Sequence, residues 1–150
     1  VFSSTMQVAS MIKLSTNRAI TNHPHYEDKK LRDTTFKIYQ MYGRISVEDY
    51  YQTLKEIGTT HIVVENGICY SNDGPVPFCD TKSILDRSNG HLSIDRSLDD
   101  MAYAKFNEKM DSQLPERFCL AVQHQGSVNG GLPLFRRVFQ NRTFRIYELR

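Results

Sequence analysis

A capped helix followed closely by a short β-branched strand is the feature that most constrains the fold of this chain. Residues 46–49 read Ser-Val-Glu-Asp, a pattern that begins helices, and apolar side chains then recur on one face as far as Gly58. Residues 61–65 read His-Ile-Val-Val-Glu, which is typical of a short, largely buried strand. A helix that leads into a strand in this way favours βαβ units and a partly parallel sheet.

The same alternation of strand-like and helix-like segments runs through the first half of the chain. We expect strands at 1–3 and 19–22, helices at 4–16, 29–42 and 97–110, one helical turn around 83–86, a short helical or strand-like piece at 118–122, and a hairpin or closing strand at 134–139 and 143–149. The predicted class is α/β. We expect a small mixed, partly parallel sheet flanked by helices, right-handed crossovers, an antiparallel C-terminal strand or hairpin at an edge, and long irregular loops.

Composition excludes several classes of protein. The chain has 150 residues, enough for one domain, and its net charge of +2 is too balanced to favour a nucleic-acid partner. No apolar run approaches the ~20 residues of a membrane span. The chain begins with Val1 and shows no signal peptide, so we expect a processed protein or a fragment of a longer one. Glycine-rich phosphate loops and the Gly-x-Ser-x-Gly elbow are absent, which argues against a nucleotide site and a serine hydrolase.

The most polar cluster lies in residues 21–28, between a predicted strand and a predicted helix. It holds two imidazoles, a phenol and two carboxylates around one proline. If the segment is extended, His23 and His25 point to the same side, at a place where open α/β sheets bind ligands. A structural alternative is a proline-stiffened loop in which Glu27 and Asp28 cap the following helix.

A metal site is one chemical interpretation of this segment. His23 and His25 could share an ion with Glu27 or Asp28, but no nearby cluster supplies a fourth ligand. We therefore predict no metal, and favour hydrogen bonds from these side chains to a polar ligand or to a neighbouring domain.

Three cysteines allow one disulfide. Cys69 and Cys79 flank a turn-rich loop, and a bridge between them is our prediction; a Cys79–Cys119 bridge is the alternative. No Cys-x-x-Cys pair is present, which argues against a structural zinc site.

The sequence contains one acceptor sequon for N-linked glycans. It reads Asn141-Arg142-Thr143 and falls in the turn of the predicted C-terminal hairpin. We therefore predict that Asn141 is glycosylated, which is compatible with a protein of the secretory pathway.

Several segments resemble the C-terminal luminal region of the Dumpy-type protein C-mannosyltransferases. The most specific is Asn-His-Pro-His-Tyr-Glu-Asp at 22–28. The resemblance is strong over residues 1–70 and moderate over 118–149. The other matching segments are 1–7, 13–16, 31–32, 39–42, 68–70, 89–91 and 138–141.

The resemblance implies a glycosyltransferase of the GT-C class in the endoplasmic-reticulum membrane. That family transfers mannose from dolichyl-phosphate-mannose to the indole C2 of tryptophan, in Trp-x-x-Trp segments of unfolded secretory polypeptides. Residues 1–150 would then be a single soluble luminal domain, a fragment of a larger multi-pass membrane enzyme. Such a lobe would pack on the transmembrane region of the same protein. It would carry no catalytic residue and no cofactor of its own, and it would be inactive alone.

The resemblance also suggests which residues help to bind the acceptor. Related oligosaccharyltransferases carry a substrate-reading motif just after the first strand of their lobe. The matching place here is Ser4-Thr5-Met6-Gln7, which does not carry that tryptophan-rich motif. The full set of candidates is His23, His25, Tyr26, Glu27, Asp28, Arg32, Met6 and Gln7. The alternatives are a non-catalytic folding or partner-interaction lobe of an inactive family member, and a free-standing metal- or ligand-binding domain.

Overall fold

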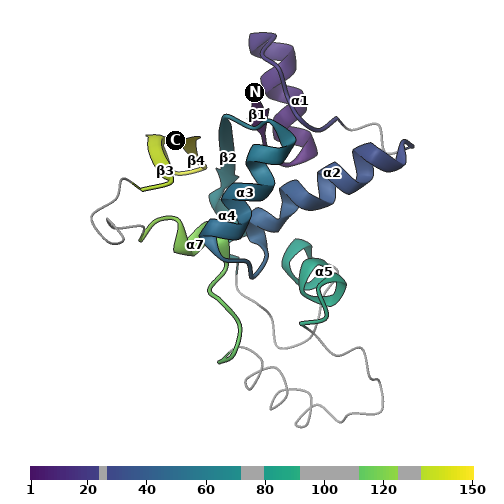
Figure 1. Ribbon diagram of the computed structural model, residues 1–150. Helices are drawn as coiled ribbons and strands as arrows, with labels where there is room; N and C mark the ends of the chain where they lie inside the picture. The colour runs from purple at the N-terminus through teal and green to yellow at the C-terminus, as the bar shows by residue number, and fades with distance from the viewer. Residues whose placement is uncertain (24–26, 72–79, 92–111, 125–132) are drawn as a thin grey trace.

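A four-stranded mixed sheet organises the protein. The computed structural model describes residues 1–23, 27–71, 80–91, 112–124 and 133–150, and Figure 1 shows their arrangement. The strands are β1 (Phe2–Ser3), β2 (His61–Glu65), β3 (Phe135–Gln140) and β4 (Phe144–Leu149), in the spatial order β1-β2-β4-β3. The β1–β2 pair is parallel, whereas β4 is antiparallel to both β2 and β3. The predicted α/β class with a mixed sheet and an antiparallel C-terminal hairpin is therefore confirmed.

The C-terminal hairpin supplies half of the sheet. β4 lies inside it, with Ile62 opposite Tyr147, and β3 forms the edge with a register shift between Arg137 and Phe139. The strand predicted at 19–22 is reduced to a single parallel bridge between Phe2 and Ile20. A two-residue β1 offers few backbone groups for a longer ladder on that side.

Helices carry most of the remaining described chain. They are α1 (Met6–Thr16), α2 (Lys29–Tyr39) continued by the 3-10 turn η1 (Gln40–Tyr42), α3 (Val47–Ile57), α4 (Asn66–Cys69), α5 (Thr81–Ser88) and α7 (Phe118–Ala121). The Asp49 N–H donates to the Ser46 hydroxyl at 3.1 Å, and Gly58 ends α3 with φ +81°, so the predicted cap and stop of this helix are confirmed. None of the described helices is long and apolar enough to cross a membrane.

Two segments of the chain differ from the sequence-based expectation. The Asn66-Gly67 turn is the first half of α4, which continues directly from β2. The single turn expected around 83–86 is the middle of the two-turn helix α5. The helix expected at 97–110 lies outside the described residues.

The core lies between the sheet and the helices α2, α3 and α7. Tyr50 of α3 and Phe118 of α7 are fully buried, with ring centroids 4.4 Å apart. Phe118 also meets Phe135 of β3 at 5.2 Å, so one aromatic cluster joins two helices to the edge strand. Rings of this size bury enough apolar surface to dominate the stability of a small core.

The disulfide differs from the sequence-based prediction. Cys69 is bonded to Cys119, with their Cα atoms 6.0 Å apart, so both the Cys69–Cys79 pairing and the Cys79–Cys119 alternative are wrong. Cys69 ends α4 and Cys119 lies in α7, and both are buried in the same core. Packing of two helices brings these sulfurs together, whereas the spacing of cysteines along the chain reports only on local loops. Cys79 lies outside the described residues.

Candidate functional site

The carboxyl ends of the parallel strands bring polar side chains together. The Thr5 hydroxyl, just beyond β1, donates to a carboxylate oxygen of Glu65 at the end of β2. The Glu65 N–H donates to the Tyr42 hydroxyl at 3.0 Å. Open α/β sheets bind ligands beyond the carboxyl ends of their strands, so this edge is the candidate site.

Burial changes the acid–base chemistry of Tyr42. Its side chain is fully buried, and loss of solvation raises the pKa of the phenol well above its ordinary value. The hydroxyl is therefore neutral over the physiological pH range and acts as a fixed hydrogen-bonding group.

Asn22 ties the start of the polar segment 22–28 to β1. Its side-chain amide is 1% exposed and donates to the Ser4 carbonyl at 2.8 Å. The carbonyl oxygen of the same amide has no hydrogen-bond partner among the described residues. The Ser4 hydroxyl in turn donates to the Val63 carbonyl of β2 at 2.8 Å, so this loop is anchored to both parallel strands.

The first turn of α1 contacts the last turn of α2. The Thr5 hydroxyl is engaged with Glu65 and does not cap α1. The Met6 N–H, which would otherwise have no partner at the helix start, donates to the Tyr39 hydroxyl at 3.2 Å. Met6 and Tyr39 therefore stand together at the edge of the candidate site.

A pocket of about 170 Å³ opens beside this contact. We call it the α2–α5 pocket, because α2 and α5 supply most of its walls. Its lining residues are Met6, Thr35, Phe36, Tyr39, Thr81, Ile84 and Leu85. Phe36 and Ile84 are 40% and 50% exposed, whereas Thr35 and Leu85 are buried. The pocket is thus mostly apolar, with two aromatic rings and a thioether among its walls.

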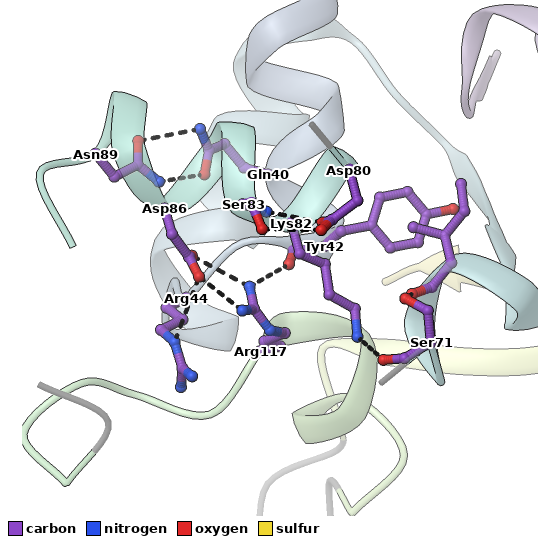
Figure 2. A network of polar contacts seen from close by, with 11 residues as sticks. Gln40, Tyr42, Arg44, Ser71, Asp80, Lys82, Ser83, Asp86, Asn89 and Arg117 are labelled. Atoms are coloured by element: carbon purple, nitrogen blue, oxygen red, sulfur yellow. Dashed lines mark hydrogen bonds and ion pairs between the residues drawn. The ribbon is translucent and has the colours of Figure 1, made fainter. Parts of the chain in front are cut away.

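A buried ion pair holds α5 in place as one wall of the pocket. Figure 2 shows the Arg117 guanidinium facing the Asp86 carboxylate, with N···O distances of 3.1 and 2.6 Å. The same guanidinium donates to the Tyr42 carbonyl at 3.1 Å, and Arg44 lies 3.9 Å from Asp86. The Arg117 guanidinium, at the start of α7, therefore contacts both α5 and η1.

A pair of side-chain amides fixes the far end of α5. Gln40 and Asn89 donate to each other's carbonyl oxygens, at 3.3 and 2.9 Å (Figure 2). A Cβ at position 43 would lie 2.5 Å from the Gln40 amide oxygen, so a larger residue than Gly43 would displace the Gln40 side chain from this pair. The ion pair of Asp86 and the amide pair of Asn89 therefore both hold the C-terminal half of α5.

Asp80 begins α5. Its carboxylate accepts from the Ser83 N–H and hydroxyl, at 2.9 and 2.8 Å. Partial burial opposes ionisation, but these hydrogen bonds outweigh it and hold the pKa of Asp80 below its ordinary value. Two residues further along the chain, the Lys82 ammonium donates to the Ser71 carbonyl at 2.6 Å.

The structure places the predicted acceptor-binding residues in different settings. Met6 lines the α2–α5 pocket, whereas Gln7, His23, Glu27 and Asp28 are exposed. His25 and Tyr26 lie outside the described residues.

Two of these residues have structural contacts in the loop itself. The Asp28 carboxylate accepts from the Leu31 N–H at 2.9 Å, so Asp28 caps α2. Arg32 donates to the Glu27 carbonyl at 2.8 Å. The structural alternative for this segment is therefore confirmed for Asp28. The described residues contain no group of three or more His, Cys, Asp or Glu side chains that could hold a metal ion.

Sequence reasoning missed most of the pocket. Thr35 and Tyr39 are four residues apart, which places them on one face of α2, and both line the pocket. The available signal in the sequence was the hydroxyl of Thr35 among mostly apolar side chains on this face of α2. The wall formed by Thr81, Ile84 and Leu85 depends on where α5 packs, and no local pattern reports on that.

The fold resembles that of a globular domain of known structure. The structure resembles the C-terminal globular domain of an oligosaccharyltransferase, AfAglB-S2, from Archaeoglobus fulgidus, with a TM-score of 0.57 and 12% identity. The match covers 100% of this chain and 84% of the archaeal one. At this identity the likeness concerns the fold alone.

Sequence comparison identifies the family. The Dpy19 family, described as "Q-cell neuroblast polarisation", matches residues 1–149. The human "Probable C-mannosyltransferase DPY19L4" is 32% identical over 99% of this chain and 19% of its own length. The "C-mannosyltransferase dpy-19" of Caenorhabditis briggsae is 36% identical over 76% of this chain and 16% of its own length. This chain therefore spans about a fifth or less of these relatives, and it belongs to the Dpy19 family of C-mannosyltransferases.

Proposed function

We propose that these residues form the luminal lobe of a C-mannosyltransferase of the endoplasmic-reticulum membrane. The match of the Dpy19 family to residues 1–149 is the observation that carries this proposal. The whole enzyme would transfer mannose from dolichyl-phosphate-mannose to tryptophan in Trp-x-x-Trp segments. The donor site and the catalytic residue would lie in the membrane-embedded remainder of the protein, on which this lobe packs. The isolated lobe would then transfer no mannose.

The lobe's contribution would be to hold the acceptor polypeptide. Indole C2 is a weak nucleophile, so its attack on a mannosyl donor depends on close and oriented placement of the two reactants. A binding surface outside the reaction centre can supply the binding energy for that placement. The candidate site supports this role, because it combines an apolar pocket with polar groups at the ends of β1 and β2.

The α2–α5 pocket would be the part of the lobe that contacts an acceptor side chain. Phe36 and Tyr39 offer ring surfaces, and Met6 offers a polarisable sulfur that packs well against aromatic rings. The exposed position of Phe36 makes its ring accessible to a ligand.

Acceptor kinetics of the full-length protein test this role. Phe36→Ala should raise KM for a Trp-x-x-Trp peptide about five- to tenfold while leaving kcat nearly unchanged, because only binding contacts are lost. Leu14→Ala is the matched control, since Leu14 is an apolar side chain that is 87% exposed and lies outside the pocket. Equal KM values for Phe36→Ala and the unaltered protein would favour a lobe used only for folding or partner contact.

A further inference from the structure

Thr35 carries a hydroxyl that the fold does not use. The residue is 3% exposed, lies in the middle of α2 and lines the α2–α5 pocket. Its side-chain oxygen is buried and has no hydrogen-bond partner in the described part of the chain. Buried polar groups without a partner are rare in proteins, because an unpaired group loses its hydrogen bonds to water and gains none in return.

Other hydroxyl groups in the helices of this protein form hydrogen bonds with the backbone of their own helix. Four of them donate to the carbonyl four residues earlier: Ser10, Ser15, Thr16 and Thr53, at 2.7 to 3.0 Å. Such back-bonding is the usual outcome for serine and threonine inside a helix. Thr35 is buried, which makes the need for a partner greater, and yet its hydroxyl makes no such bond.

The chemistry of the pocket restricts what could satisfy this hydroxyl. The walls around it are Met6, Phe36, Tyr39, Ile84 and Leu85, which favour a flat apolar ligand. An apolar cavity of about 150 Å³ is large enough to bind benzene. A pocket of about 170 Å³ beside an unpaired hydroxyl therefore suits an aromatic ring system that carries one polar hydrogen.

We propose that the α2–α5 pocket binds one indole side chain of the acceptor polypeptide, and that the indole N–H donates a hydrogen bond to the Thr35 hydroxyl. Thr35 is thus a specificity-determining residue. This inference rests on the proposed function for the choice of tryptophan among ring systems with a polar hydrogen. The indole N–H is a donor and never an acceptor, which matches an oxygen that has both lone pairs available.

The consequence is discrimination between aromatic side chains. A site built to hydrogen-bond a polar group rejects an analogue that lacks this group, because the site's own buried atom is then left unpaired. Phenylalanine, or tryptophan methylated on the indole nitrogen, would fill the apolar walls but leave Thr35 without a partner.

The test compares peptide binding by the full-length protein, in the absence of the mannosyl donor, while two things are varied: the residue at position 35 and the methylation of the tryptophan in the peptide. Dissociation constants are measured by fluorescence anisotropy for labelled Trp-x-x-Trp peptides, with each tryptophan in turn replaced by 1-methyltryptophan. In the unaltered protein, methylation of the bound tryptophan should weaken binding about five- to tenfold. In Thr35→Val the methylated and unmethylated peptides should bind equally, and Thr35→Ser should restore the difference.

Thermal unfolding of the same variants separates ligand binding from a structural role. Thr35→Val should leave Tm unchanged or raise it, because valine has the same shape and removes an unpaired buried hydroxyl. A lowered Tm in Thr35→Val would mean that the hydroxyl has a partner within the fold, and would overturn the proposal. So would a preference for unmethylated peptide that persists in Thr35→Val, or its absence in the unaltered protein.

The two proposals can fail separately. If Phe36→Ala impairs acceptor use but Thr35→Val leaves the methylation preference intact, the assignment of the indole hydrogen bond is wrong and the acceptor role of the pocket stands. If the methylation preference depends on Thr35 but the full-length protein transfers no mannose, the indole site stands and the enzymatic proposal fails.

Discussion

Arg117 and Asp86 meet through two hydrogen bonds in the protein interior, and each side chain is only 6% exposed. The pair joins the residue before α7 to the buried face of α5. A bidentate arginine–carboxylate contact fixes direction as well as distance, so it sets the orientation of α5. The α2–α5 pocket takes one wall from that helix.

Removal of one partner should destabilise the protein strongly. Among the described residues, Arg117→Met leaves the buried Asp86 carboxylate with the more distant Arg44 alone, and we expect a loss of about 3–5 kcal/mol in the free energy of unfolding. Urea denaturation measures this loss. Arg136→Met is the matched control: its ion pair with Glu148 lies on the exposed hairpin and should be worth at most about 1 kcal/mol. Similar losses for the two variants would contradict the structural role of the buried pair.

The disulfide should connect Cys69 to Cys119 in the folded protein. Peptide mapping under non-reducing conditions should therefore recover these two cysteines in one linked fragment. With a sequence separation of 50 between the two cysteines, the chain-entropy model gives a stabilisation of about 4 kcal/mol, which Cys119→Ser should remove. Cys79→Ser is the control and should leave the free energy of unfolding unchanged. Loss of the linked fragment in Cys79→Ser would refute the pairing.

Local signals accounted for the helices and strands that the sequence predicted correctly. Ser46 begins α3 and Gly58 ends it, and both act through hydrogen bonds and dihedral angles within a few residues. The run of β-branched residues at 62–64 likewise located β2, and the C-terminal hairpin was also expected from its sequence. These predictions succeed because the determining contacts are close in sequence.

Tertiary contacts account for the predictions that failed. Cys69 and Cys119 meet because α4 and α7 pack in one core, and no spacing rule reports that. Of the predicted acceptor-binding residues, the structure places Met6 against the pocket and gives Asp28 a capping role. The wall on α5 depends on how that helix packs beside α2, and no local sequence pattern reports on that packing.

Tyr42 should make the protein sensitive to alkali. Its phenol has an ordinary pKa of 10.0, and burial raises the pKa in the folded state. The unfolded chain therefore loses this proton first. The stabilisation is complete below about pH 10 and falls by about 1.4 kcal/mol for each further pH unit. Unfolding free energies measured above pH 10 should fall less steeply in Tyr42→Phe.

Tyr70→Phe provides the control for this pH dependence, because Tyr70 is 54% exposed. The free energy of unfolding of Tyr70→Phe should fall above pH 10 as steeply as that of the unaltered protein. A slope in Tyr42→Phe that is as steep as in Tyr70→Phe would show that the buried phenol does not govern the alkaline transition.

Asn141 should carry an N-linked glycan when the protein is made in a secretory host. The residue is exposed at the β3–β4 turn, and its side-chain oxygen accepts from the N–H groups of Thr143 and Phe144, at 2.8 and 2.7 Å. Asn66 contacts the turn through the backbone carbonyls of 141 and 142, so the side-chain nitrogen of Asn141 can carry a sugar without disturbing that contact. Glycosidase treatment should lower the mass of the unaltered protein. Thr143→Ala keeps Asn141 but destroys the sequon, so its mass should not change, and a protein whose mass is equally unaffected with Thr143 in place would refute the prediction.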